Sequence, residues 1–325
     1  MRPLEEIIGA IQGAQSVALV SHVNPDGDTV GSALALKLGL DKLGKRTAMF
    51  CEDKVPDRIA FLKGAETYRR LEDAPEERFD LLVCVDVADE DRMGSCRPLL
   101  ERCTHTAQLD HHCTNPNYAA FNCVDPKAPA TALVVRELLG RLGVAIDADL
   151  AACLYVAIST DTGNYEFAST SPEAFHVTGD LLSAGLPLSA ISRRLYRQRE
   201  AAQVRLIQRA LSTLTFYHGG EVTSMTLTQQ DFEDCEALPE HADTIVNFGI
   251  DIQGVRMTVL ARETGAPGEV KLSMRAVEPD SVAEVAKAFG GGGHAQASGA
   301  TVYGALDDCV AQCVAAFEET LEKSE

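Results

Sequence analysis

The sequence has no apolar run of the roughly 18 residues that a membrane-spanning helix needs. It also lacks the pattern of a secretory signal, because its first ten residues, MRPLEEIIGA, carry acids where a signal peptide has a basic start and an apolar core. We therefore expect a cytoplasmic protein that does not associate with membranes.

Closely spaced cysteine pairs are also missing. The ten cysteines are scattered, and none forms a CxxC pair with zinc-like spacing. Without a secretory signal, reduced thiols that fill the core are favoured over a disulfide framework.

Basic residues are few compared with acidic ones. The chain has 29 Lys and Arg against 48 Asp and Glu, for a net charge of −19 and a pI near 4.8. Proteins that grip long nucleic acid usually have a broad basic surface, which this composition excludes. An anionic substrate would have to be small or a very short oligonucleotide, attracted by bound metals and a few local arginines.

The 325 residues are enough for two domains with their own cores, and no internal repeat is visible. Residues 1–188 alternate apolar strands with helical segments, which predicts an α/β domain with a doubly wound, mostly parallel sheet. The expected strands are 17–20, 47–51, 79–87 and a segment ending at 108–109, and the expected helices are 3–14, 33–43, 56–63, 131–142 and a segment from the N-cap Asp147 to about Ser159.

A basic stretch follows, and we expect residues 189–210 to be a helical linker. Its arginines are Arg193, Arg194, Arg197, Arg199, Arg205 and Arg209. They form either a solvated helix face or a basic wall facing an anionic substrate.

Residues 211–325 predict a smaller α+β domain. The patterns indicate a hairpin of strands 212–217 and 222–227, two more strands at 254–263 and 270–276, and helices at 281–289 and 306–323.

Residues 21–32, SHVNPDGDTVGS, lie between the first strand and the helix at 33–43. The Asn-Pro and Asp-Gly pairs predict a tight loop, which leaves the carboxyl end of a strand, where open α/β sheets bind ligands. This loop and three further segments carry the polar side chains His22, Asp26, Asp28, Asp86, Asp110, His111, His112 and Asp161. Together at one sheet edge, these carboxylates would repel one another unless about two divalent cations lay among them. Oxygen and nitrogen ligands without thiolate favour Mn²⁺, or Mg²⁺, Co²⁺ or Fe²⁺, over structural zinc.

A second motif is the glycine-rich run GGGGHAQASG at residues 290–299. Its glycines allow positive φ, and their N–H groups could form a nest for an anion. Arg262 and Arg275, at the ends of the neighbouring strands, are candidates for binding a phosphate or stacking on a base. A surface salt bridge is the alternative role for each arginine.

The segments HVNPDGD at 22–28, Asp86, DHH at 110–112 and DTG at 161–163 resemble the four ordered motifs of the DHH phosphoesterase superfamily. The glycine-rich run is similar to the signature of its DHH-associated substrate domain, so the resemblance covers almost the whole chain. It implies that His22, Asp26 and Asp86 hold one metal, and that Asp28, Asp86, His111 and Asp161 hold a second.

The resemblance also implies roles for other residues. His112 would face the scissile phosphate, and Asp110 would orient an imidazole. The substrate's nucleotide would be bound by the C-terminal residues Arg262, Arg275, Gly291, Gly292, Gly293, His294 and Ser298.

Within the superfamily, a compact two-domain chain with GGGGH is most similar to the bacterial nano-RNase and pAp-phosphatase branch. This branch degrades oligoribonucleotides of roughly two to five nucleotides and often converts 3′-phosphoadenosine 5′-phosphate (pAp) to AMP. The expected function is therefore a manganese-dependent phosphodiesterase and pAp phosphatase. The alternatives are a phosphodiesterase for cyclic or linear dinucleotides, a small-molecule phosphatase and a nucleotide sensor without catalysis. A homodimer is implied by the resemblance alone.

Overall fold

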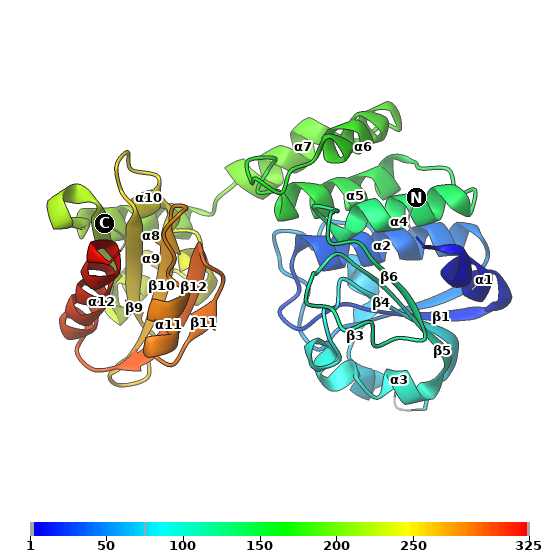
Figure 1. Cartoon of the computed structure of the whole chain (residues 1–325), viewed down its shortest axis with the longest axis horizontal. Helices are drawn as coiled ribbons and strands as arrows, with labels where there is room; N and C mark the ends of the chain where they lie inside the picture. The colour runs from blue at the N-terminus through cyan, green and yellow to red at the C-terminus, as the bar shows by residue number, and fades with distance from the viewer. Residues whose placement is uncertain (1–2, 75, 324–325) are drawn as a thin grey trace. The chain divides into compact units, whose positions relative to one another are not determined.

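The computed structural model describes residues 3–74 and 76–323. The chain divides into two compact units, Met1–Gln198 and Arg199–Glu325. In Figure 1 the first unit runs from blue to green and the second from yellow-green to red. Among the described residues no helix is long and apolar enough to span a membrane. Among the described residues the ten cysteines form no disulfide, and eight of them are buried, as expected for reduced thiols that fill the core.

The first unit is built on a six-stranded sheet in which all neighbouring strands are parallel. In sheet order the strands are β3 (Tyr68–Arg69), β2 (Arg46–Phe50), β1 (Ser16–Val20), β4 (Phe79–Val85), β5 (Cys103–Asp110) and β6 (Phe121–Val124). This order reverses direction between β1 and β4, which is the doubly wound arrangement that the sequence predicts. Strands β3 and β6 were not expected, because they have only two and four residues and no clear apolar run.

Helices cover both faces of this sheet. The α-helices of the unit are α1 (Glu5–Gly13), α2 (Gly27–Lys42), α3 (Leu99–Arg102), α4 (Thr131–Arg141), α5 (Ala148–Asp161), α6 (Pro172–Ser183) and α7 (Leu188–Ser192). Figure 1 shows α2, α4 and α5 on one face and α3 on the other. Strand β1 is therefore buried on both sides, with Val17 and Leu19 in one cluster and Ala18 and Val20 in the other.

Two expected helices differ from the structure. The segment 56–63 forms only turns and no regular helix. Its hydrogen bonds are local, such as the one from the Leu62 N–H to the Ile59 carbonyl. The basic stretch is not one helix either. After α7 comes a π-helical turn, Arg193–Arg197, then extended backbone at Gln198 and Glu200, and then α8 (Ala201–Ser212).

The second unit contains a six-stranded mixed sheet. Its strands in sheet order are β11 (Gly292–Gly293), β12 (Ala297–Tyr303), β10 (Glu269–Ala276), β9 (Met257–Glu263), β8 (Val222–Leu227) and β7 (Thr215–Tyr217). Only β8 and β9 are parallel, and β7–β8 is the expected hairpin. Besides α8, the helices are α9 (Gln229–Cys235), α10 (Asn247–Ile250), α11 (Ala283–Ala288) and α12 (Leu306–Glu322). Helix α12 buries Phe317 against one face, whereas α8 and α9 bury Leu206 and Phe232 against the other.

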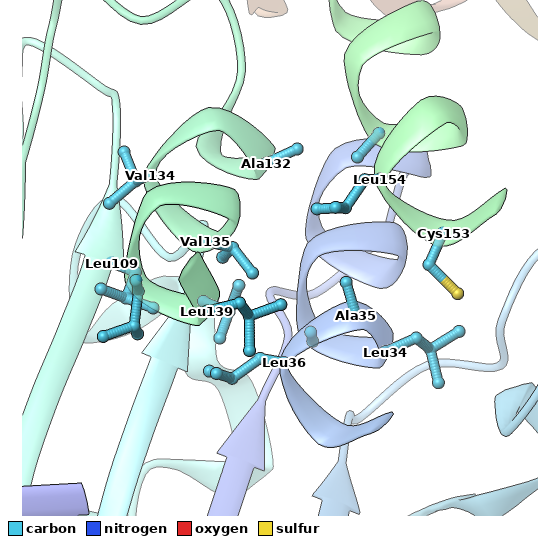
Figure 2. Packing of buried hydrophobic residues seen from close by; sticks show 14 of the residues in the cluster. Leu34, Ala35, Leu36, Leu109, Ala132, Val134, Val135, Leu139, Cys153 and Leu154 are labelled. Atoms are coloured by element: carbon cyan, nitrogen blue, oxygen red, sulfur yellow. The ribbon is translucent and has the colours of Figure 1, made fainter. Parts of the chain in front are cut away.

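Helix α2 is central to the first unit, because nearly its whole circumference is buried. Leu36 of α2 and Leu139 of α4 lie side by side between the two helices, whereas Leu34 points away from α4, as Figure 2 shows. On the side facing α5, a Cβ added at Gly31 would lie 2.5 Å from the Cys153 carbonyl oxygen. Only glycine permits this approach of the two helices.

We predict that Gly31→Ala lowers the free energy of unfolding by about 1–3 kcal/mol, because the added methyl group forces two buried backbones apart. Gly9→Ala in α1 is the matched control. A Cβ at Gly9 meets nothing within 4 Å, so alanine there should be neutral or stabilising by up to about 1 kcal/mol. Urea denaturation of the full-length variants, followed by circular dichroism, compares the two. Equal midpoints would show that the close approach is not required.

Candidate metal and phosphoester site

The candidate site lies where the sheet order reverses, at the carboxyl ends of β1 and β4. Chain segments leaving adjacent strands in opposite directions at such a point leave a crevice where α/β proteins bind ligands. Strand β1 leads into His22, and β4 leads into Asp86. Asp86 adopts a left-handed backbone with φ of 60°, a strained conformation for a residue other than glycine. This turn directs the carboxylate away from the path of the strand.

The segment after β1 is more regular than the sequence suggested. The expected loop over residues 21–32 ends early, because α2 already begins at Gly27. The Asp26 carboxylate caps this helix and accepts hydrogen bonds from the N–H groups of Asp28 and Thr29 at 3.0 and 3.1 Å. Asp28 consequently lies in the first helical turn, so its direction is fixed by the helix. Gly27 is needed here for packing, because a Cβ would overlap the Thr160 side chain.

Asp28 is 1% exposed and is held by hydrogen bonds on both oxygens. One oxygen accepts from the N–H of Thr131 at 2.6 Å, at the start of α4. The other accepts from the Ser32 hydroxyl at 2.8 Å. The first N–H groups of a helix favour a negative charge, so α4 helps to keep this buried carboxylate ionised.

Asp86 is 2% exposed and lies among the histidines. Its Oδ1 accepts from the Thr131 hydroxyl at 2.8 Å, so Thr131 contacts both buried aspartates. Its Oδ2 lies 3.7 Å from His22 Nε2, and its Oδ1 lies 3.7 Å from His111 Nε2. Asp86 is therefore placed between the two imidazoles.

The two imidazoles are oriented in the same way. Nδ1 of His22 lies 2.8 Å from the Val23 carbonyl oxygen, and Nδ1 of His111 lies 3.0 Å from the Ala128 carbonyl oxygen. A ring nitrogen that donates to a carbonyl leaves Nε2 with its lone pair free, as a metal-ligating histidine requires.

Asp26 and Asp161 complete the arrangement. His22 Nε2 lies 3.7 Å from the Asp26 carboxylate, and His111 Nε2 lies 3.3 Å from that of Asp161, the last residue of α5. Three sets of potential ligand atoms, each within 4.8 Å of one another, result from this geometry: His22–Asp26–Asp86, Asp28–His111–Asp161 and Asp86–His111–His112.

The carboxylates are crowded and short of positive charge. Burial, together with the negative charges of Asp86 and Asp161, raises the pKa of Asp28 well above its usual value. Burial likewise raises the pKa of Asp86 and raises that of Asp161 to about 7. Divalent cations would relieve this repulsion, and the oxygen and nitrogen donors suit such ions. The residues present therefore fit a metal centre.

His112 and Asp110 form a separate pair beside these ligands. His112 Nδ1 lies 2.8 Å from Asp110 Oδ1, and this hydrogen bond raises the pKa of His112 to about 9. Asp110 is fully buried, and its second oxygen accepts from the Asn115 amide at 2.5 Å. The imidazole is thus held with Nδ1 on Asp110 and Nε2 free, and it carries a proton at neutral pH.

In the second unit, Arg262 and Arg275 lie on the same face of the sheet, because Arg275 pairs with Thr258, four residues from Arg262 on β9. Their backbones are about 13 Å apart along the strands. Arg262 is 8% exposed, and its guanidinium lies 6.0 Å from the centre of the Phe232 ring. Arg275 is half-buried and donates to the Met274 carbonyl at 2.9 Å, and burial lowers its pKa. Neither arginine forms an ion pair with a carboxylate in the described part of the chain.

The glycine-rich run forms the short strand β11 and the turn that connects it to β12. It does not form one open nest of N–H groups. Gly290 and Gly291 donate to carbonyls at the end of α11, while Gly292 and Gly293 pair with β12. A Cβ at Gly291 would overlap the Gly299 carbonyl, so glycine is required there. His294 is exposed at the turn, and the Ser298 hydroxyl donates to its carbonyl oxygen at 2.8 Å.

The structure thus brings together all eight polar residues singled out in the first unit, and it places the seven C-terminal candidates on or beside β9, β10 and the β11–β12 turn. Sequence reasoning missed Thr131, Asn115 and Arg92, whose guanidinium lies 2.9 Å from His22 Nδ1. The position of Thr131 at the start of an expected helix was a usable signal, because such N–H groups attract carboxylates. Asn115 lies in an irregular segment and Arg92 in the short helical turn Asp91–Cys96, and neither gave such a signal.

Comparisons with known proteins agree with this geometry. The N-terminal domain model of the DHH family matches residues 16–158, and the DHHA1 domain model matches residues 232–323. The chain is 33% identical to the bifunctional oligoribonuclease and PAP phosphatase NrnA of Thermus thermophilus, covering 100% of this chain and 95% of that protein. It is 23% identical to the Bacillus subtilis protein of the same name, covering 92% and 93%.

Among solved structures, an exopolyphosphatase-related protein from Bacteroides fragilis matches with a TM-score of 0.89 and 25% identity, over 98% of this chain and 95% of that one. The matched ranges include the motifs at 22–28, 86, 110–112 and 290–299, whereas DTG at 161–163 lies just beyond the end of the first range. The chain therefore belongs to the DHH family and carries a DHHA1 domain in its C-terminal half.

Proposed function

We propose that this protein is a metal-dependent hydrolase that cleaves very short oligoribonucleotides and removes the 3′-phosphate from pAp. The observation that carries the proposal is the gathering of four carboxylates and two oriented imidazoles, without a thiolate, at the switch point of the sheet. The activities named for the Thermus and Bacillus relatives support this substrate class. The net charge of −19 also favours a short substrate bound at a local site over a long nucleic acid bound along an extended basic surface.

His22, Asp26 and Asp86 would hold one divalent ion, and Asp28, Asp86, His111 and Asp161 a second, with Mn²⁺ the favoured metal. When bound, such a pair lowers the pKa of a water molecule and offsets charge on phosphoryl oxygens. The protein orients the ligands through Thr131, Ser32 and the Val23 and Ala128 carbonyls. This support keeps the carboxylates in place before a substrate arrives.

His112 would act on the substrate directly. Asp110 holds Nδ1, so the protonated ring presents its Nε2–H to a phosphoryl oxygen or to the leaving oxygen. As water attacks phosphorus and the P–O bond to the leaving group breaks, that oxygen takes the proton from Nε2. In the second unit, Arg262 and Arg275 would bind separate parts of the nucleotide, with Gly291, Gly292, Gly293, His294 and Ser298 shaping the adjoining turn. A cytoplasmic location is also part of this proposal, as is a homodimer, which the resemblance alone implies.

The first prediction concerns substrate choice. With Mn²⁺, we expect the full chain to release mononucleotides from a dinucleotide and AMP from pAp, but to leave a 24-mer almost uncut. Asp86→Asn should lower the rate by about 10²–10³-fold, because it weakens both ligand sets at once. Chelation with EDTA should abolish turnover, and added Mn²⁺ should restore it.

The products distinguish the alternatives. Phosphate release from pAp without dinucleotide cleavage would favour a small-molecule phosphatase, and preferential cleavage of cyclic di-AMP would favour a cyclic-dinucleotide enzyme. Tight nucleotide binding without turnover in Mn²⁺, Mg²⁺, Co²⁺ or Fe²⁺ would indicate a sensor and contradict the proposal.

The second prediction concerns His112. Removing its imidazole by His112→Asn should lower kcat by about 10²–10⁴-fold, the usual range for loss of a proton donor. The affinity for Mn²⁺ should change little, because His112 belongs to neither proposed ligand set. A variant with full activity would exclude the role in proton transfer.

The third prediction is a pKa measurement on the chelator-treated protein. Because the Asp110 charge stabilises the imidazolium, His112 should lose its proton only as the pH rises through about 9. In Asp110→Asn the neutral partner no longer favours the charged ring, so deprotonation should move down toward 6.5. A histidine NMR titration of both proteins measures the difference. An unchanged pKa would show that Asp110 does not control this proton.

A further inference from the structure

Arg92 is a half-buried residue at the edge of the candidate metal site, and its side chain has no role in the arrangement described so far. It follows Asp86 by six positions and lies in the short helical turn Asp91–Cys96. Its guanidinium nitrogen Nη2 lies 2.9 Å from Nδ1 of His22, whose other ring nitrogen faces Asp26 and Asp86.

The backbone at Arg92 is firmly held against the segment after β1. Its carbonyl accepts from the Val23 N–H at 2.8 Å, and its own N–H donates to the Asp89 carboxylate at 2.9 Å. Two residues later, a Cβ at Gly94 would lie 2.5 Å from the Val23 side chain. The base of the Arg92 side chain is therefore fixed relative to His22.

The orientation of His22 leaves the guanidinium without an acceptor. For Nε2 to serve as a metal ligand, Nδ1 must carry the proton and donate it to the Val23 carbonyl, 2.8 Å away. His111 shows the same arrangement with the Ala128 carbonyl. In that tautomer the N–H of Arg92 faces the N–H of His22, so the two groups cannot form a hydrogen bond.

No carboxylate compensates for this arrangement. Within residues 3–74 and 76–323, Arg92 forms no ion pair, whereas Arg97, directly after the same helical turn, pairs with Glu90 at 2.7 Å. The nearby Asp89 carboxylate already accepts from the Arg92 backbone. A charged guanidinium with unused donors, beside a centre suited to phosphoesters, is matched by an anion with several oxygens.

We propose that Arg92 is a substrate-binding residue that donates to a phosphate group of the nucleotide on the His22 side of the metal centre. This inference rests on the proposed function and adds to the metal ligands a fixed positive charge from the N-terminal unit. The planar guanidinium can bind two phosphate oxygens at once, which a lysine ammonium cannot do with the same geometry.

The test compares Arg92→Gln and Arg92→Lys with Arg97→Gln as the matched control. Arg97 is exposed and ion-paired directly after the same turn, so its loss removes a charge of the same sign without touching the site. Steady-state kinetics on pAp and a dinucleotide, and calorimetric titrations with AMP in Mn²⁺ and with Mn²⁺ alone, measure substrate and metal binding separately.

We expect Arg92→Gln to lower kcat/KM and AMP affinity by about 10- to 100-fold, because a charge-assisted hydrogen bond is lost. Arg92→Lys should recover part of this loss, and Arg97→Gln should behave as the wild type. Affinity for Mn²⁺ should stay within about threefold in all three variants, since Arg92 does not orient the ligand atom of His22.

Other outcomes would overturn the inference. If Arg92→Gln weakens Mn²⁺ binding and excess Mn²⁺ restores its activity, Arg92 positions His22 and does not bind substrate. If the wild type is active and Arg92→Gln matches it in kinetics and AMP affinity, only this inference fails. If the wild type hydrolyses no substrate, the proposed function fails, and the AMP titration still decides the role of Arg92. Absence of AMP binding by the wild type would overturn both.

Discussion

The close approach of α2 and α5 is the constraint on which the candidate site depends. Gly31 lets the α2 backbone reach the Cys153 carbonyl, and Gly27 leaves room for the Thr160 side chain. This contact brings the first turn of α2, which carries Asp28, to the last turn of α5, which carries Asp161. Neither helix alone could place these carboxylates near His111. The packing of two helices therefore determines where the second ligand set lies.

In that arrangement the buried carboxylates repel one another, and other interactions in the fold must offset this repulsion. Asp28 and Asp86 are almost fully buried, and an isolated ionised carboxylate in such surroundings is strongly disfavoured. The N–H of Thr131, at the N-terminus of α4, donates to Asp28, and the Thr131 hydroxyl donates to Asp86. These hydrogen bonds reduce the cost of burial without neutralising the charge, so the affinity for a divalent ion is preserved. The left-handed Asp86 backbone fits the same pattern of local strain at a functional site.

The sequence predicted the α/β class, a site at one sheet edge and the residues that gather there, because all of these follow from short-range signals. Val17 to Val20 read as a buried strand from apolar content, and Asp147 read as a helix cap from residue type and position. The early start of α2 was missed because Asn-Pro and Asp-Gly are turn signals, whereas Asp26 also caps a helix.

Other features depend on contacts between segments far apart in the chain. Strand β6 exists through its pairing with β5, and four residues carry too little pattern to reveal it. Asn115 reaches Asp110 across an irregular turn, and Arg92 reaches His22 from a short helical turn seventy residues away. Such contacts are set by tertiary packing and have no periodicity, so single-sequence reasoning cannot find them.

The unusual charge balance is consistent with this site. A chain with net charge −19 repels nucleic acid at long range, so attraction has to come from charges within a few ångströms of the phosphate. Two cationic side chains lie beside the ligand sets, because His112 Nδ1 is 3.7 Å from the Asp86 carboxylate and the Arg92 guanidinium is 2.9 Å from His22 Nδ1. Bound metal ions would add positive charge at the ligand sets themselves. Under the proposed function, a short nucleotide would need only these local charges, whereas the additional phosphates of a long strand would be repelled by the net negative charge of the protein. Local cations on an acidic protein would therefore, under that function, favour small phosphorylated substrates over long strands.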